Sequence, residues 1–194
     1  MTDIKSLCVF CGAAVGDNPA YAEAARALGH MMGQRGIKLV FGAGHVGMMG
    51  IVADAALAAG GDAIGVIPQH LMDRELAHDG LTELHVVESM HVRKQKMFDL
   101  ADAIAVLPGG FGTLDETFEV ITWKQLGLHD KPILLIDTED YWQPFAELIG
   151  NITRSGFARG NHADLFALVK TPEELFDLLE TLPESHASAD PDKF

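Results

Sequence analysis

The sequence predicts an α/β protein: a Rossmann-like, doubly wound parallel sheet flanked by helices, in three layers. Apolar runs of strand length alternate with helical stretches along the chain, and these runs are apolar on both faces. Strands of this kind are buried on both sides, as in parallel sheets sandwiched between two helix layers. Because no Pro-, Gly- or Ser-rich linker interrupts the alternation, we expect a single domain.

The expected elements follow this alternation in order. Strands are predicted at residues 6–11, 38–41, 62–67, 84–87, 103–107, 133–136 and 165–169. Helices are predicted at residues 19–35, 47–59, 90–100, 113–126 and 141–151, with a last one after Thr171. Asn18-Pro19 and Thr171-Pro172 mark two helix starts, because an N-cap side chain followed by proline is typical of a first turn. The residues after Pro183 are polar, small or charged, so we expect a domain of residues 1–182 and a frayed tail of residues 183–194.

Composition and charge narrow the range of partners. Of the 194 residues, 48% are hydrophobic and 22% are charged, which is ordinary for a globular domain. The formal net charge is −14, so most of the surface repels the phosphates of nucleic acids and anionic membranes. No apolar run reaches the ~18–20 residues of a membrane span, and residues 1–5 lack the basic and apolar regions of a signal peptide. We therefore expect a cytoplasmic protein with no nucleic-acid or membrane partner, in which any anionic ligand depends on local donors.

Cys8 and Cys11 form a C-x-x-C motif, which in redox proteins places the first sulfur at a helix N-terminus. Here both cysteines lie in an apolar run typical of a strand, where residues three apart point to opposite faces. We interpret them as two buried, small hydrophobic side chains rather than as redox or metal-binding thiols.

The first candidate loop is Gly42-Ala43-Gly44-His45-Val46-Gly47, which follows a predicted strand and opens a predicted helix. It matches the dinucleotide-binding pattern G-x-G-x-x-G. That function also requires an acidic residue at the end of the next strand, whereas Asp62 stands at that strand's beginning. NAD binding is therefore disfavoured, and two interpretations stay open: a nucleotide contact that includes Gly44, or a purely structural tight turn.

The second candidate loop runs from Pro108 to Thr113, between a buried strand and a helix expected to begin near Thr113. Its glycines bring backbone N–H groups around a point ahead of the helix dipole, and the threonine adds a hydroxyl donor. We therefore predict a phosphate site formed by Gly109, Gly110, Gly112 and Thr113. Glu116 follows about one helical turn later, so its carboxylate either faces the same cavity or merely complements the helix dipole.

A third element, Met90-His91-Val92-Arg93-Lys94-Gln95-Lys96-Met97, is basic. On a helix, Met90, Arg93 and Met97 share one face. A buried guanidinium between two methionines needs an anionic partner, so we assign Arg93 to the site. Lys94 is rotated by about 100° and is expected at the rim of the same site, whereas Lys96 is expected in solvent.

Other chemistries find less support in the sequence. Glu75 follows a strand that ends at Pro68, so it is expected either at the ligand edge of the sheet or in solvent. The nine histidines show no metal-binding spacing, and we predict no metal. No G-x-S-x-G elbow is present, and covalent nucleophilic catalysis is not indicated.

Together these motifs resemble the LOG family, the cytokinin riboside 5′-monophosphate phosphoribohydrolases, which were long labelled lysine decarboxylase-like. The family pattern P-G-G-x-G-T-x-x-E is matched from Pro108 to Glu116, and its methionine-flanked R-K pair is matched within residues 90–97. The resemblance covers nearly the whole chain. A small departure is Gly42-Ala43-Gly44, where the family often has three glycines, and a methyl group there is expected to be tolerable.

The resemblance implies hydrolysis of the N-glycosidic bond of an N6-substituted AMP to free base and ribose 5-phosphate, without a cofactor. It implies that the second loop holds the 5′-phosphate and that Glu116 stabilises charge developing at the ribose. Arg93 would either polarise the departing base or keep Glu116 ionised. Glu75 and Thr122 match substrate contacts of the family, and its short members form homodimers. Apolar helices such as residues 51–59, with more hydrophobic surface than one core needs, agree with a dimer.

Two alternatives come from other classes of protein. A NAD-dependent oxidoreductase would use the loop at residues 42–47, and the misplaced Asp62 argues against it. A non-catalytic nucleotide-binding carrier would keep only the phosphate site, and the combination of Arg93 with Glu116 argues against it. A pyridoxal-phosphate decarboxylase would need a Schiff-base lysine and a partner for the pyridine nitrogen, and only the phosphate site is evident. The sequence leaves the preferred base open.

Overall fold

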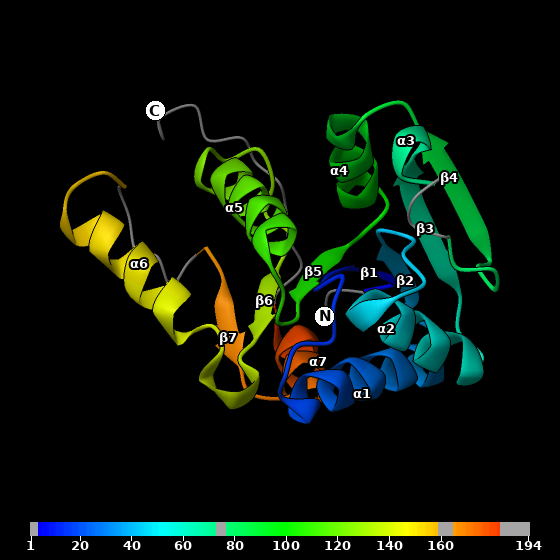
Figure 1. The fold of residues 1–194 in the computed structure, drawn as a ribbon. Coiled ribbons are helices and arrows are strands. Elements are labelled where there is room, and N and C mark those ends of the chain that lie inside the picture. Colours follow the sequence, from blue (N-terminus) through cyan, green and yellow to red (C-terminus); the bar gives the residue numbers. More distant parts are fainter. Residues whose placement is uncertain (1–3, 73–76, 159–164, 183–194) are drawn as a thin grey trace.

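The computed structural model describes residues 4–72, 77–158 and 165–182. Its centre is a seven-stranded, all-parallel sheet with the strand order β4-β3-β2-β1-β5-β6-β7 (Figure 1). The strands are β1 (Ser6–Phe10), β2 (Lys38–Phe41), β3 (Ala63–Pro68), β4 (Glu83–Val87), β5 (Ala103–Val106), β6 (Ile133–Ile136) and β7 (Ala167–Val169). Each predicted strand is present within about two residues of its expected bounds.

Helices cover both faces of this sheet, which confirms the predicted three-layer, doubly wound fold. Helices α1 (Pro19–Arg35), α2 (Gly47–Ala58) and α7 (Pro172–Thr181) pack on one face. The other face is covered by α4 (Met90–Asp99), α5 (Phe111–Gln125) and α6 (Gln143–Arg154). Two short helices, α3 (Gln69–Met72) and the 3-10 turn η1 (Thr138–Asp140), were not predicted.

The chain reverses its winding direction at β1. From β1 it winds outward to β4, and it then crosses back so that β5 pairs with β1 on the other side. The loops after β1 and β5 therefore diverge at the carboxyl edge of the sheet. In open α/β sheets this switch point is where ligands bind.

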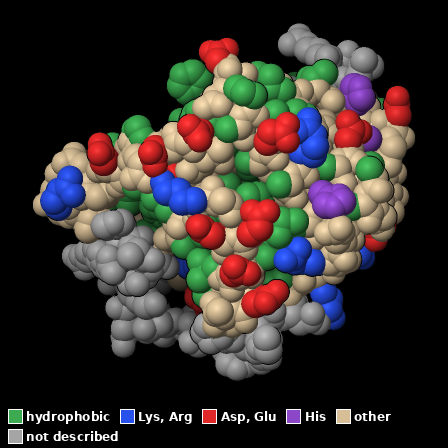
Figure 2. Space-filling view, turned by 90° about the horizontal axis from the view of Figure 1, so that it is seen from below, with side chains coloured by type: hydrophobic (Ala, Val, Ile, Leu, Met, Phe, Trp, Pro, Cys, Tyr) green, Lys and Arg blue, Asp and Glu red, His purple; other side chains and the backbone are tan. Residues whose placement is uncertain are grey.

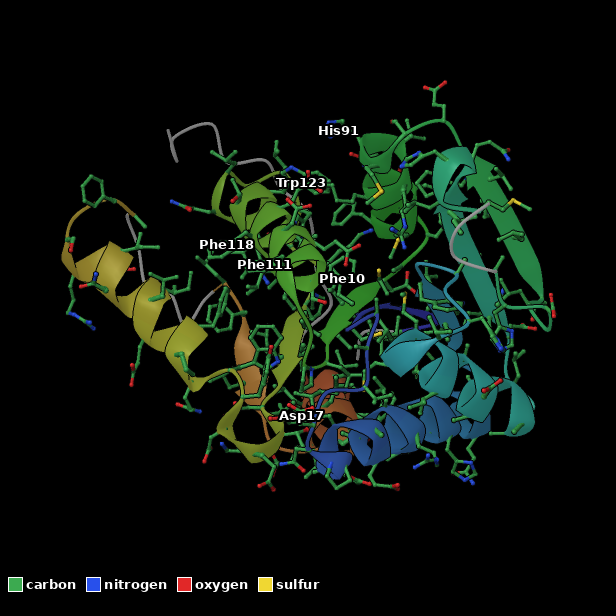
Figure 3. The ribbon with its side chains drawn as sticks, viewed as in Figure 1. Phe10, Asp17, His91, Phe111, Phe118 and Trp123 are labelled. Carbon is green, nitrogen blue, oxygen red and sulfur yellow. The ribbon has the colours of Figure 1, made fainter. Side chains whose placement is uncertain are left out.

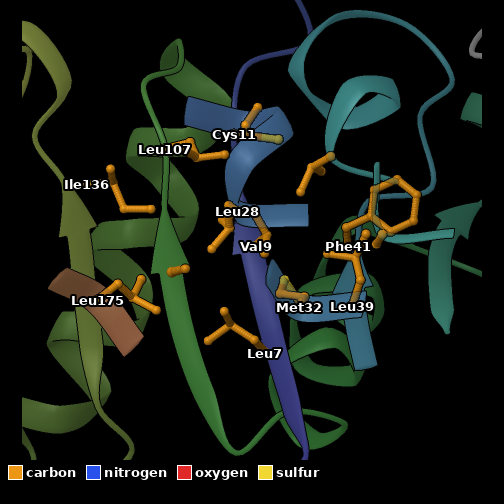
Figure 4. Close-up of a cluster of buried hydrophobic side chains, with 14 of the residues drawn as sticks. Leu7, Val9, Cys11, Leu28, Met32, Leu39, Phe41, Leu107, Ile136 and Leu175 are labelled. Carbon is orange, nitrogen blue, oxygen red and sulfur yellow. The ribbon is translucent and has the colours of Figure 1, made fainter. Parts of the chain in front are cut away.

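Two hydrophobic clusters fill the spaces above and below the sheet. Figure 4 shows the cluster beneath α1, in which Leu7, Val9 and Cys11 of the first strand region meet Leu28 and other side chains of α1 and α2. Cys8 belongs to the opposite cluster, so the two cysteines point to opposite faces as predicted. Both thiols are free and buried, and burial raises the pKa of each, which keeps them protonated and unreactive.

Helices α1 and α2 pack unusually closely because glycines face the contact. A Cβ atom on Gly29 would lie 2.3 Å from the carbonyl oxygen of Val52, and one on Gly33 would lie 2.5 Å from that of Ala56. Most apolar side chains of α2 are buried in this contact or against the sheet. Within residues 51–59, Val52, Ala53 and Ala56 are buried, and Ile51 and Leu57 are partly buried against the same cluster.

The predicted helix starts can be compared with the starts in the structure. Asn18 accepts a hydrogen bond from the backbone N–H of Ala20, and Thr171 accepts one from that of Glu174, so both predicted caps are confirmed. Helix α5, in contrast, begins at Phe111 rather than near Thr113, because Gly110 takes the N-cap position.

No helix among the described residues is long and apolar enough to cross a membrane. Acidic side chains are spread over the face seen in Figure 2, in line with the net charge of −14.

Candidate active site

A cavity of about 560 Å³ opens at the carboxyl ends of β1, β2 and β5. Its lining comes from the loops after these strands, from the inward face of α4, and from the first turns of α5. Of the predicted site residues, six line it together: Arg93, Gly109, Gly110, Gly112, Thr113 and Glu116. The cavity therefore lies at the switch point of the sheet, where the fold favours ligand binding.

The loop between β5 and α5 presents free backbone donors to this cavity. Gly110 is the N-cap of α5, and within the described part of the chain no side chain caps that helix. The N–H groups of residues 111–113, the first turn of the helix, therefore have no intrahelical partner. A Cβ atom placed on Gly110 or Gly112 would meet nothing within 4 Å, so both glycines border open space. This combination of free amides and a positive dipole end suits an anion such as a phosphate group.

Thr113 and Gly109 close the inner side of the same loop. Thr113 is buried, and a Cβ atom on Gly109 would lie 2.1 Å from the Thr113 hydroxyl oxygen. Only glycine at position 109 lets the threonine hydroxyl approach the loop so closely. The loop is tied to the neighbouring strand by a 3.1 Å hydrogen bond from the Gly12 N–H to the Pro108 carbonyl.

Arg93 is held rigidly beside the cavity by backbone groups. Its side chain is buried, with Nε donating to the Val66 carbonyl at 3.1 Å and Nη2 donating to the Gly42 carbonyl at 2.8 Å. A Cβ atom on Gly42 would lie 1.9 Å from Nη2, so the guanidinium occupies space that only glycine leaves free. As predicted, Met90 and Met97 share this face of α4 and line the cavity with Arg93.

Glu116 shares the cavity with Arg93 and with the free amides of α5. Burial raises the pKa of its carboxyl to about 7, and the nearby positive charge of Arg93 opposes that rise. A carboxyl with a pKa near neutrality is typical of general acid–base groups. The structure thus puts Glu116 on the cavity side of the helix rather than on a solvent-facing first turn.

Lys94 lies outside the cavity and joins α4 to α5. Its ammonium group contacts the carboxylates of Asp115 at 3.0 Å and Glu119 at 3.1 Å. These two acids raise the pKa of Glu116, whereas Lys94 lowers it. Lys94 therefore acts on the cavity electrostatically, by neutralising the acids next to Glu116, one of which, Asp115, lines the cavity.

Two further predicted residues, Gly44 and Thr122, do not line the cavity. Gly44 packs against Met49, whose Cε would lie 2.6 Å from a Cβ atom at that glycine. Thr122 is exposed on α5, and its hydroxyl donates to the Phe118 carbonyl at 2.7 Å. Glu75 lies outside the described residues. Among the residues described, no group of three or more His, Cys, Asp or Glu side chains forms a candidate metal site.

Comparisons with known proteins point to one family. The profile of a family described as possible lysine decarboxylase matches residues 49–179. A probable cytokinin riboside 5′-monophosphate phosphoribohydrolase of Oryza sativa subsp. japonica is 42% identical over 182 residues, which are 94% of this chain and 75% of that protein. A cytokinin riboside 5′-monophosphate phosphoribohydrolase of Rhodococcoides fascians is 46% identical over 154 residues, or 79% of this chain and 78% of that protein. The chain belongs to the LOG family.

Solved structures extend the likeness of this LOG-family chain at the level of fold. The molybdenum cofactor binding protein of Rippkaea orientalis superimposes with a TM-score of 0.69 and 20% sequence identity, covering 91% of this chain and 94% of that one. At this identity the likeness concerns the architecture alone.

Sequence reasoning missed one wall of the LOG-family cavity. The loop after β1, residues 12–16, lines it together with both tyrosines of the chain, Tyr21 from α1 and Tyr141 from the turn before α6. Gly12 and Gly16 in the first strand–helix loop were an available signal, because that loop stands at the switch point of a doubly wound sheet. The tyrosines gave no local signal, since only the folded chain brings them to the cavity.

Proposed function

We propose that this LOG-family protein is a phosphoribohydrolase that cleaves the N-glycosidic bond of N6-substituted adenosine 5′-monophosphates of the cytokinin type. The products are the free base and ribose 5-phosphate. One observation carries the proposal: the open, uncapped N-terminus of α5 and the Glu116 carboxyl face a single cavity. The names of the curated relatives give the same reaction class.

The 5′-phosphate binds at the start of α5. The N–H groups of residues 111–113 and the Thr113 hydroxyl supply donors, and Gly110 and Gly112 leave space for the phosphate oxygens. This local site overcomes the repulsion that a chain of net charge −14 exerts on an anion. It also explains a requirement for monophosphates over nucleosides, because the phosphate anchors the ribose beside Glu116.

Glu116 stabilises the positive charge that develops at C1′ as the bond to the base breaks. Its carboxylate, within the cavity, also orients and deprotonates the attacking water. The water oxygen forms the new bond to C1′, and the electron pair of the broken bond leaves with the base, which takes up a proton. An oxocarbenium-like transition state of this kind gains from a nearby anion, by analogy with glycoside hydrolysis.

Arg93 favours the ionised form of Glu116. Two of its guanidinium nitrogens donate to backbone carbonyls, which fixes the charge at one place in the cavity wall. From there it lowers the pKa of Glu116 against the effect of burial. Of the two roles considered for Arg93, this one is supported by its effect on the pKa of Glu116.

The two alternative functions fit the cavity less well. In the loop that a NAD-dependent oxidoreductase would use, the Cβ positions of Gly42 and Gly44 are occupied by neighbouring side chains, so these glycines serve the packing of Arg93 and Met49. A carrier would not need a carboxyl whose pKa is raised to about 7 beside the phosphate site. The description of the family as possible lysine decarboxylase is not supported by the names of the curated relatives.

We also propose a cytoplasmic homodimer. Exposed apolar side chains lie at both ends of α5, where Phe111 in its first turn is 93% exposed and Leu128, just after its end, is 67% exposed. Figure 3 shows Phe111, Phe118 and Trp123 along this helix. Phe111 also lines the cavity, so a second subunit packed against it would lie close to the cavity. Light scattering coupled to size-exclusion chromatography measures the mass that decides this.

A cofactor-free hydrolysis assay tests the function. The purified protein is incubated with isopentenyl-AMP, AMP and isopentenyladenosine, and the released base is quantified by chromatography. We expect release from the monophosphates and none from the nucleoside, with the ratio of the two monophosphates giving the base preference. Absence of release from all three, or equal release from the nucleoside, contradicts the proposal.

A further inference from the structure

The segment between β6 and α6, residues 137–141, forms a strap that reaches the cavity at its last residue, Tyr141. It ends in Tyr141, whose hydroxyl donates a hydrogen bond to the Gly109 carbonyl in the loop before α5. The ring of Tyr141 meets Tyr21 edge-on, with centroids 5.5 Å apart and an interplanar angle of 74°. The strap therefore connects two residues that lie far apart in sequence, Gly109 and Tyr21, at the cavity wall.

The backbone of this strap is strained. Glu139 and Asp140 have φ values of 55° and 59°, in the left-handed region that residues other than glycine avoid. Strained backbone of this kind persists only where the surrounding structure determines it, and it is typical of functional sites. A turn that merely linked β6 to α6 could have used glycine, as the described part of the chain does at six other left-handed positions: Gly16, Gly36, Gly47, Gly60, Gly127 and Gly156.

A buried carboxylate holds the strained strap in place. Asp137 is fully buried and accepts hydrogen bonds from the Trp142 N–H at 2.7 Å and from the Lys170 ammonium at 2.7 Å. Gln143 donates a third bond to the same carboxylate. Lys170 also contacts Asp140 at 2.6 Å, which ties the middle of the strap to β7's end. These contacts fix the position from which Tyr141 reaches the loop.

The hydrogen bond from Tyr141 determines the direction of a peptide group. In a planar trans peptide, the carbonyl of Gly109 and the N–H of Gly110 point in opposite directions. A donor that fixes this carbonyl therefore also fixes the N–H of Gly110, the residue that opens α5. The other side of the loop is already supported, since the Gly12 N–H donates to the Pro108 carbonyl.

We propose that Tyr141 is a positioning residue for the phosphate loop: its hydroxyl holds the Gly109–Gly110 peptide so that the Gly110 N–H faces the phosphate of the ligand. This rests on the proposed function only in taking a phosphate monoester as the ligand. Tyr141 itself need not touch the reacting atoms. The role of its hydroxyl is separable from its packing, because phenylalanine preserves the edge-on contacts with Tyr21 and Trp142.

Binding measurements on Tyr141→Phe test this role. The probes are ribose 5-phosphate, which carries the phosphate, and adenosine, which lacks it, each titrated by calorimetry. We expect the dissociation constant of ribose 5-phosphate to rise about tenfold and that of adenosine to stay unchanged, as befits the loss of one aligned donor. In turnover assays, KM for the monophosphate rises by a similar factor while kcat changes little.

Thr153→Val is the matched control. It removes a hydroxyl that also donates to a backbone carbonyl, that of Ile149 at 3.1 Å, but on α6 and away from the residues lining the cavity. It should bind ribose 5-phosphate like the unmodified protein. Unchanged ribose 5-phosphate affinity in Tyr141→Phe, or an equal loss for adenosine, overturns the positioning role. If the unmodified protein fails to bind ribose 5-phosphate, the role of Tyr141 and the phosphate site fall together, whereas binding without hydrolysis overturns the proposed function alone.

Discussion

The loops that follow β2 and β5 are both rich in glycine and both open a helix, but their glycines face different surroundings. After β2, a Cβ atom on Gly42 would lie 1.9 Å from Arg93, and one on Gly47 would lie 2.2 Å from the Ala13 carbonyl. After β5, Gly110 and Gly112 border open space. In the first loop glycine lets protein atoms approach one another, and in the second it leaves room for something that is not protein.

This difference teaches how to interpret a glycine-rich loop. The pattern G-x-G-x-x-G occurs after β2, yet the role of that loop is to leave space for the guanidinium of Arg93 and to accept its hydrogen bond. The less familiar pattern after β5 presents its free amides to the cavity. What separates a binding loop from a packing loop is the surroundings of its glycines, which only the folded structure reveals.

We expect the largest loss of activity from a substitution of Glu116, which shares the cavity with the loop after β5. Glu116→Gln removes the negative charge while keeping the shape of the side chain, so kcat should fall by roughly 10³-fold. The affinity for ribose 5-phosphate should persist, because the amides of α5 are untouched. Steady-state kinetics and calorimetry on the same preparation separate these two outcomes. A variant with near-normal turnover would remove Glu116 from the mechanism.

The same substitution should stabilise the protein above neutral pH. Burial raises the pKa of Glu116 to about 7, so the folded state holds a proton there that the unfolded chain releases at lower pH. The stability that this group contributes is present at low pH and is lost as pH rises through about 7. At pH 8 the free energy of unfolding of Glu116→Gln should therefore be about 3 kcal/mol higher than that of the unmodified protein. This difference should shrink toward pH 5. Urea unfolding at both pH values measures it, and an equal gain at the two pH values would contradict the assignment.

Gly42→Ala probes the packed loop. Its methyl group would collide with Arg93 Nη2, which is buried and hydrogen-bonded and therefore cannot move without losing its contacts. We expect a stability loss of about 1–3 kcal/mol from overpacking and a fall in kcat of about a hundredfold from the displaced guanidinium. Thermal unfolding measures the loss of stability, and steady-state kinetics measure the fall in kcat. Unchanged turnover would mean that Arg93 does not depend on this glycine.

Gly110→Ala is the matched substitution in the open loop, and its expected effects are smaller and opposite in kind. Its methyl group meets no protein atom, so stability should change by no more than about 1 kcal/mol. The methyl enters the space assigned to the phosphate, so KM for the monophosphate should rise about tenfold. If Gly110→Ala unfolded as readily as Gly42→Ala, the contrast between the two loops would be lost.

The sequence predicted most of the fold because its signals are local and repeated. The apolar runs and the caps at Asn18 and Thr171 each depend on a few neighbouring residues, and the structure places those elements within about two residues. The strap at residues 137–141 could not be foreseen, because left-handed backbone at Glu139 and Asp140 leaves no mark in the residue types. Ala43 is similar: its methyl group is accommodated as expected, but at a φ of 64° that nothing in the sequence indicated.

The site was predictable where residues lie close in sequence and not where tertiary packing decides. Arg93 and Met97 share a helical face whatever the fold, and the glycines before α5 follow their strand directly. The ion pairs of Lys94 could not be foreseen, because its partners, Asp115 and Glu119, belong to another helix. Tyr141 was missed for the same reason, since it follows β6 in the chain but bonds to the loop that follows β5.

The central claim, that the loop after β5 and not the loop after β2 binds the phosphate of the ligand, has a direct test. Backbone amide signals of ¹⁵N-labelled protein are assigned and followed by NMR while ribose 5-phosphate is added. We predict that the signals of Gly110, Phe111, Gly112 and Thr113 shift in a saturable way, with those of Gly44 and Gly47 nearly unmoved. Saturable shifts confined to Gly44 and Gly47 would contradict it, as would the absence of any shift at residues 110–113.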